Sequence, residues 1–179
     1  MKRVFTIVLF IIIIPVMLSA ENEGFDTDYF YIYAPDGWQT GAEGDHLFYL
    51  FSLNGNYFVQ IDRVDASEDY PDREMEDIDF KNFTLEDKQG LLAQVAADIN
   101  VVYDGFELID KDILEINGME MLLVYCTFKN DEDLQVSCAR GVTLKEGYYY
   151  VVTMLANGSE FSQEAEELYG NMLASFTVK

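Results

Sequence analysis

The sequence is short of the residue types that most catalytic and metal sites need. Its 179 residues include one histidine, two cysteines and one tryptophan. The histidine, His46, stands beside Asp45 with no serine or cysteine at a motif spacing. Cys126 and Cys138, without histidines near them, fall short of the four ligands that a structural zinc ion takes. No catalytic residue, no cofactor site and no firm metal site is therefore predicted.

Basic residues are also scarce. Lysine and arginine number 11 against 33 acidic residues, giving a formal charge of −22. Nucleic acid and anionic membranes are bound through basic surfaces, so the composition argues against both as partners. The same charge permits a basic protein or cations as partners, and it also favours solubility on its own.

Long apolar runs are missing except at the N-terminus. Lys2 and Arg3 precede an apolar run from Val4 to Met17, and Leu18-Ser19-Ala20 resembles a cleavage site. Residues 1–20 are predicted to be a signal peptide. The alternative is an uncleaved anchor, but the run is short for a span of about 20 residues. The protein is expected to be secreted or extracytoplasmic (periplasm or cell surface), without a membrane span after cleavage, and residues 21–179 to form a single domain.

Hairpin signals dominate the rest of the chain. Asn54-Gly55 and Asn117-Gly118 are pairs that type I′ turns favour, because both central residues need positive φ. Counting outward from the first pair places Phe48 opposite Ile61 and Leu50 opposite Val59. Residues 39–45 are interpreted as a glycine-rich loop. The predicted strands are 29–34, 46–53, 56–64, 106–116, 119–129, 134–144 and 148–155.

Two helices complete the predicted fold. The first begins at Thr84, where Thr84 and Asp87 have capping-box spacing. Its predicted apolar face holds Leu85, Leu92, Val95, Ala96 and Ile99. The second is capped by Ser162. The expected fold class is α+β, an antiparallel sheet of about six to seven strands with hairpins and a C-terminal meander, flanked by two main helices. The residues expected to be buried are Phe48, Ile61, Val124, Val152 and Leu173.

An acidic segment at 65–79 interrupts these elements. It is predicted to be an exposed, mobile loop, because eight acids stand against Arg73 alone. It lacks the EF-hand spacing, so its oxygens are only weak candidates for a cation. These weak metal candidates are Asp65, Glu68, Asp69, Asp72, Glu76, Asp77 and Asp79.

The two cysteines fall on neighbouring predicted strands. If the turn at 130–133 is centred on Glu132, Cys126 and Cys138 lie directly opposite each other. A secreted chain occupies a compartment where disulfides persist, so a disulfide between them is predicted. The alternative is a pair of reduced, buried cysteines.

Three short motifs stand out: the segment from Tyr31 to Trp38 (YIYAPDGW), Ile116-Asn117-Gly118, and the helix end at Leu173-Ala174-Ser175-Phe176. Together they resemble the Mog1/PsbP-like group, including its bacterial extracytoplasmic members of unknown function. The resemblance implies an antiparallel sheet with helices on its faces, forming a sandwich. It also implies a binding or assembly role without shared catalytic residues.

Three functions stay open. The first is a non-enzymatic extracytoplasmic binding or assembly module, whose partner through the acidic loop would be a basic protein. The second is a hydrolase that uses a carboxylate pair invisible in the sequence. The third is a cation-responsive surface protein that acts through the acidic loop.

The leader generates one prediction. The natively exported protein should begin at Glu21, because Ala20 closes the small-residue cleavage site. Mass spectrometry of the exported protein measures this directly, and a chain that retains Met1 would reject it.

Overall fold

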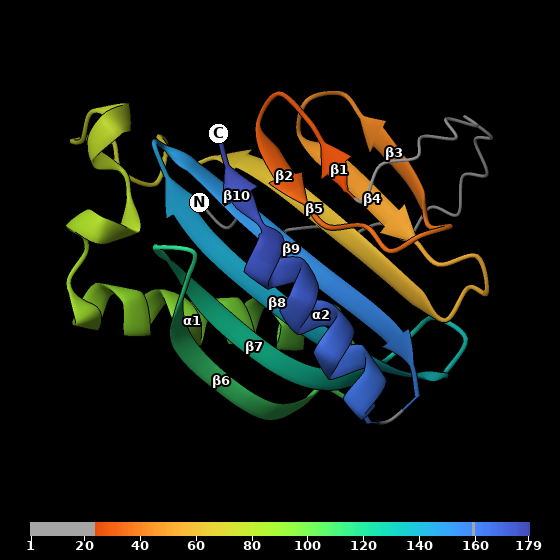
Figure 1. The fold of residues 1–179 in the computed structure, drawn as a ribbon. Coiled ribbons are helices and arrows are strands. Elements are labelled where there is room, and N and C mark those ends of the chain that lie inside the picture. Colours follow the sequence, from red (N-terminus) through yellow and green to blue (C-terminus); the bar gives the residue numbers. More distant parts are fainter. Residues whose placement is uncertain (1–23, 159) are drawn as a thin grey trace.

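The structure is a computed structural model that describes residues 24–158 and 160–179. The predicted leader, 1–20, and its cleavage site lie outside the described residues. A seven-stranded antiparallel sheet forms the centre, with strand order β3-β4-β5-β9-β8-β7-β6. Figure 1 shows α2 crossing one face of this sheet beside a small second sheet, and α1 lying on the opposite face. The predicted α+β sandwich is confirmed.

The large sheet holds β3 (Gln39–Glu43), β4 (Leu47–Phe51), β5 (Tyr57–Asp65), β6 (Glu107–Ile116), β7 (Met119–Lys129), β8 (Gln135–Lys145) and β9 (Tyr148–Asn157). The small sheet holds β1 (Phe25–Asp26), β2 (Phe30–Ile32) and β10 (Thr177–Val178). The α-helices are α1 (Leu85–Val102) and α2 (Gln163–Ser175), and the 3₁₀ helices are η1 (Met75–Asp77) and η2 (Phe80–Asn82).

The predicted register of the first hairpin is confirmed. Phe48 pairs with Ile61, and Leu50 with Val59. Asn117 has φ of 53° at the second Asn-Gly pair, the left-handed value that a type I′ turn requires. These turns fix the register, and because side chains alternate across a strand, the register decides which residues enter each core.

Both faces of the sheet are buried, each in its own core. One core lies under α2 and the small sheet and includes Phe48, Ile61, Val152 and Leu173. The other lies under α1 and η2 and includes Val124. All five residues predicted to be buried are buried. A sheet covered on both sides reads as continuous apolar sequence, which explains the uninterrupted run in β7.

Two strand predictions are corrected. The segment 39–43, expected to be a loop, is the edge strand β3. Its Gly41 packs against the ring of Tyr49, and a Cβ there would approach Tyr49 Cε2 to 2.5 Å. The first predicted strand forms β2 of the small sheet rather than part of the large one, because β10 and β1 pair with it on either side.

Helix α1 begins as predicted and buries Leu92, Ala96 and Ile99 of its predicted face. The Thr84 hydroxyl accepts a hydrogen bond from the Asp87 N–H at 3.2 Å, and the Asp87 carboxylate accepts one from the Thr84 N–H at 3.1 Å. Leu85, expected in the core, is 62% exposed. Lys88 is buried instead and pairs with Glu120 of β7. None of the described helices has the length and apolar character needed to span a membrane.

The three motifs that resemble the Mog1/PsbP-like group meet at the C-terminal end of α2. The Asn117 amide donates hydrogen bonds to the carbonyls of Ala174 and Phe176. The Tyr33 N–H donates to Ser175 Oγ at 2.6 Å. A helix end leaves carbonyl groups without intrahelical partners, and the turn side chain satisfies them here. The three motifs are therefore joined to one another by hydrogen bonds at the end of α2.

The docking of α2 generates a stability prediction. Leu173 is 2% exposed, so Leu173→Ala should lower the free energy of unfolding by about 2–5 kcal/mol, as is usual for a buried large-to-small change. Leu53→Ala is the control, because Leu53 is 70% exposed. Equilibrium urea unfolding compares the two. Equal losses in both variants would contradict the docking of α2 through this residue.

Candidate functional site

His46 is placed at the surface. Its ring and the neighbouring Asp45 carboxylate lie 3.5 Å apart, with 65% and 70% of their side chains exposed. Within the described residues, no three His, Cys, Asp or Glu side chains gather closely enough to hold a metal ion.

The acidic loop is anchored, which corrects the expectation of a mobile loop. The Ala66 N–H donates to the Gly147 carbonyl at 2.8 Å, and the Gly147 N–H donates to the Ile78 carbonyl at 2.8 Å. The Tyr70 and Tyr149 hydroxyls are hydrogen-bonded at 2.9 Å. Ala66 and Ile78, near the two ends of the loop, are buried. The loop is thus tied to the β8–β9 turn at both of its ends, which the sequence did not indicate.

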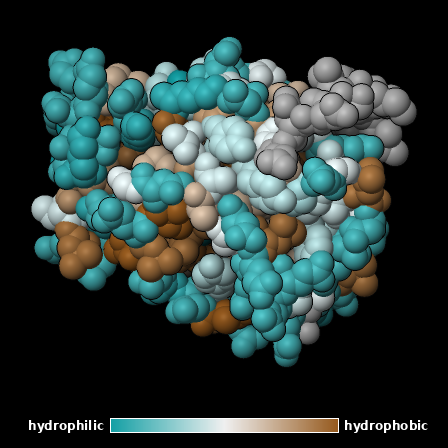
Figure 2. Space-filling view, in the orientation of Figure 1, coloured by the Kyte–Doolittle hydropathy of each residue, from teal (hydrophilic) through white to brown (hydrophobic). Residues whose placement is uncertain are grey.

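The carboxylates of this loop do not gather into a group that could hold a cation. Most are exposed; the exception is Asp79, which is 8% exposed. Asp79 accepts from the Lys81 N–H at 3.0 Å and pairs with the Lys81 ammonium at 3.2 Å, so it starts η2. The exposed weak metal candidates are Asp65, Glu68, Asp69, Asp72, Glu76 and Asp77. Figure 2 shows a hydrophilic surface at the end of the molecule where this loop lies.

Cys126 and Cys138 are paired in register, as predicted, but the predicted disulfide is not formed. Both are free, buried cysteines. Directly opposed residues in an antiparallel ladder hold their Cβ atoms about 4.5–5.5 Å apart, which exceeds the usual disulfide separation. The hydrogen-bonded thiol of Cys138, together with burial, raises the pKa of Cys126 above its usual value. The pair therefore packs as small apolar residues.

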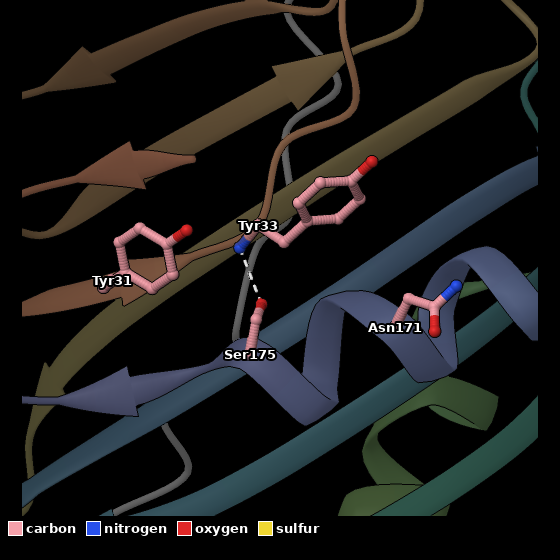
Figure 3. A pocket seen from close by; sticks show the side chains of 4 residues that line it. All are labelled: Tyr31, Tyr33, Asn171 and Ser175. Atoms are coloured by element: carbon pink, nitrogen blue, oxygen red, sulfur yellow. Dashed lines mark hydrogen bonds between the residues drawn. The ribbon is translucent and has the colours of Figure 1, made fainter. Parts of the chain in front are cut away.

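An open pocket of about 340 Å³ lies between β2 and α2. Tyr31 and Tyr33 line it from the strand, and Asn171 and Ser175 line it from the helix (Figure 3). The Ser175 hydroxyl is already engaged, since it donates to the Met172 carbonyl at 2.7 Å. The lining holds no charged group, so we interpret the pocket as the junction between helix and small sheet.

The structure assembles a polar strip that the sequence analysis missed. The strip is the row of paired residues Tyr49 (β4), Gln60 (β5), Thr153 (β9) and Arg140 (β8), which crosses the sheet on the α1 face. Arg140 Nε donates to Thr153 Oγ1 at 3.1 Å. Arg140 is 9% exposed and Thr153 is 3% exposed. The one signal in the sequence is an arginine in the middle of an apolar strand.

Two carboxylates border the polar strip. Asp62 of β5 accepts both its hydrogen bonds from Gln60 Nε2, at 3.0 and 2.9 Å. Burial raises the pKa of Asp62, against the opposing effects of Gln60, Arg140 and His46. Burial also raises the pKa of Asp98 on α1, against the effect of Arg140. Both acids thus lose hydration beside the same guanidinium.

Asp62 generates a prediction about pH. Because its pKa is raised in the folded state, the ionised carboxylate costs stability above that pKa and costs none below the usual value of 3.8. Asp62→Asn should therefore raise the free energy of unfolding at neutral pH, and the gain should vanish as the pH falls through the folded pKa. Urea unfolding over a pH series measures this, with exposed Asp36→Asn as the control. A variant less stable than wild type at neutral pH would contradict it.

Neither a protein-family model nor a curated protein sequence matches this chain. Solved structures do match. Cyanobacterial PsbP (CyanoP) from Synechocystis sp. PCC 6803 has a TM-score of 0.59 and 14% identity, over 84% of this chain and 86% of that one. LpqN, involved in cell envelope biogenesis of Mycobacterium tuberculosis, has a TM-score of 0.55 and 10% identity, over 84% and 83%.

A third match is a protein of Bacteroides thetaiotaomicron VPI-5482, with a TM-score of 0.58 and 8% identity. It covers 89% of this chain, which spans about half (49%) of the Bacteroides chain. At these identities the likeness is one of fold. The motifs at the end of α2, the sheet and these structural matches agree, and the chain has the Mog1/PsbP-like fold.

Proposed function

We propose that this protein is an extracytoplasmic, non-enzymatic module that binds a basic protein partner through its acidic loop. The observation that carries the proposal is the anchoring of the loop, by Ala66 and Ile78 on Gly147 and by Tyr70 on Tyr149. An anchored loop presents its carboxylates in one arrangement, so less conformational entropy is lost when a partner binds. The exposed acids of the loop are Asp65, Glu68, Asp69, Asp72, Glu74, Glu76 and Asp77.

The charge of the chain supports the same partner. With 33 acids against 11 basic residues, the surface attracts a basic protein over a distance set by the Debye length, about 8–10 Å at moderate salt. Arg73, the basic residue inside the loop, stacks on Phe83 with its guanidinium carbon 4.5 Å from the ring centre. It therefore turns toward the protein and leaves the carboxylates to the partner.

The extracytoplasmic location is supported by the leader pattern and by the fold. LpqN, which shares the fold, is involved in cell envelope biogenesis. None of the three matched proteins is described as an enzyme. We include an extracytoplasmic location and a non-enzymatic binding role in the proposal for this chain.

The test is affinity capture from the native envelope, followed by association kinetics with the captured protein. Neutralising the loop with Asp69→Asn, Asp72→Asn, Glu74→Gln and Glu76→Gln should lower the association rate by roughly tenfold or more, and added salt should reduce the rate for wild type. Such a rate effect is expected of electrostatic steering by exposed charges.

The matched control neutralises four exposed acids elsewhere: Asp36→Asn, Asp104→Asn, Glu107→Gln and Glu132→Gln. Both variants carry the same net charge, so the comparison separates the loop from the overall charge. Equal rates in the two variants, or a captured partner that is acidic, would refute binding through the loop.

A further inference from the structure

Arg140 is a buried cation for which the described residues provide no ion pair. Of the three charged side chains that are buried in the described part of the chain, Asp79 and Lys88 each pair with a residue of opposite charge. Arg140 makes no ion pair among residues 24–158 and 160–179, and its one hydrogen bond there runs from Nε to Thr153. A guanidinium has five N–H donors, so the four on its Nη atoms are left for another acceptor.

Asp62 is the matching anion. It is a partly buried carboxylate whose hydrogen bonds come from a single neutral amide, that of Gln60. A desolvated charge without a counter-charge is costly, and such groups concentrate at functional sites. Asp62 and Arg140 influence each other electrostatically without forming an ion pair.

The space between these two charges is bordered by short side chains. Arg140 is on β8 and Asp62 on β5, with β9 between them. Two strand spacings and a two-residue offset along the strands separate their backbones by about 12 Å. The β9 residues between them are Thr153, which pairs with Arg140, and Val151, which pairs with Asp62. A small molecule that carries both charges can reach across this distance with one end on each side chain.

The surface beside Asp62 is partly apolar. Helix α1 contacts β6 and β7, at the other edge of the sheet from β4 and β5 (Figure 1). Tyr49, Phe51 and Phe58 on the α1 face of β4 and β5 are partly exposed and belong to neither core. Phe51 and Phe58 are directly paired. These rings offer a contact surface to an apolar group next to the charges.

We propose that the polar strip and Asp62 form a binding site for a small zwitterion of the amino-acid class with an apolar side chain. The carboxylate of the ligand lies on the Arg140 Nη atoms and accepts from the Thr153 hydroxyl, which already accepts from Arg140. The ammonium group lies on Asp62. The apolar side chain lies on Tyr49 and Phe58.

Other ligands fit the residues less well. A simple anion would leave Asp62 uncompensated and would be repelled by it. A simple cation would leave the charge of Arg140 uncompensated and would be repelled by it. A divalent metal needs a set of acidic or nitrogen ligands that the described residues do not assemble. A zwitterion supplies both missing charges at once and leaves the net charge of the protein unchanged.

The probes for the test are L-phenylalanine and L-leucine, each with its N-acetyl form and its carboxamide, titrated calorimetrically into the purified protein at up to millimolar concentration. The N-acetyl form lacks the ammonium group, and the carboxamide lacks the carboxylate. Each blocked form should bind roughly tenfold or more weakly than the free amino acid, since a hydrogen bond to a charged group is lost.

Two variants separate the two ends of the site. Asp62→Asn should lower the affinity for the free amino acid and abolish the difference in affinity between the free amino acid and the N-acetyl form. Arg140→Gln should abolish its advantage over the carboxamide. Arg73→Gln is the control, because Arg73 is an exposed arginine of the acidic loop. If Arg140→Gln does not fold, the Asp62→Asn comparison decides.

Absence of binding by both free amino acids would overturn the proposal. So would equal binding of the blocked forms, or unchanged selectivity in Asp62→Asn. Binding of the N-acetyl form as tightly as the free amino acid would replace it with a site for organic anions. The inference is independent of the proposed function: the loop variant should keep amino-acid binding, and Asp62→Asn should keep partner association.

Discussion

Burial of the central sheet on both faces is the constraint on which the rest of this structure depends. Every residue from Val136 to Leu144 of β8 is buried, so no position in that strand is free to be chosen for solubility. Gly141 shows how closely the faces are packed: a Cβ there would approach Met121 Sδ to 2.7 Å and the Tyr169 hydroxyl to 3.1 Å. That hydroxyl donates to the Val152 carbonyl at 2.8 Å, which ties α2 to the sheet.

Against this background, polar side chains inside the sheet need partners. Thr143 donates to the Glu120 carbonyl at 2.8 Å, and Ser137 donates to the Ala156 carbonyl at 3.3 Å, so neither is left unsatisfied. Arg63, on the α2 face, lies between the rings of Tyr29 and Tyr148 at 4.3 and 3.5 Å, where cation–π contact compensates its charge. Within the described residues, Arg140 makes no ion pair and no cation–π contact, although its charge opposes the raised pKa of Asp62 and of Asp98. It is the buried cation that the fold itself does not explain.

The sequence predicts those features that local chemistry decides. Asn117-Gly118 has the positive φ values of the predicted type I′ turn, and Thr84 with Asp87 fixes the start of α1. At Asn54-Gly55 only Gly55 has positive φ, so the first hairpin has the predicted register without the predicted turn type. Strand β3 has no apolar alternation in QTGAE, because it is an edge strand whose stability comes from pairing with β4. The acidic loop reads as mobile because its anchors, Gly147 and Tyr149, are remote in the sequence. The polar strip draws one residue from each of four strands, and no single segment reveals that convergence.

Asp62 and Arg140 link stability to function in this fold. Each removes a charge from water without receiving a full partner, so each should lower the stability of the folded chain relative to a neutral side chain of the same shape. A purely structural role would be served better by apolar residues, as at neighbouring Val151 and Val142 in the next row across the sheet. The two charges lie in adjacent rows of the sheet and have opposite signs. Direct contact between the two side chains would compensate both charges, but strand β9 lies between them. The cancellation is thus left to a molecule that carries both charges, which is why we place the ligand there rather than in the neutral pocket beside α2.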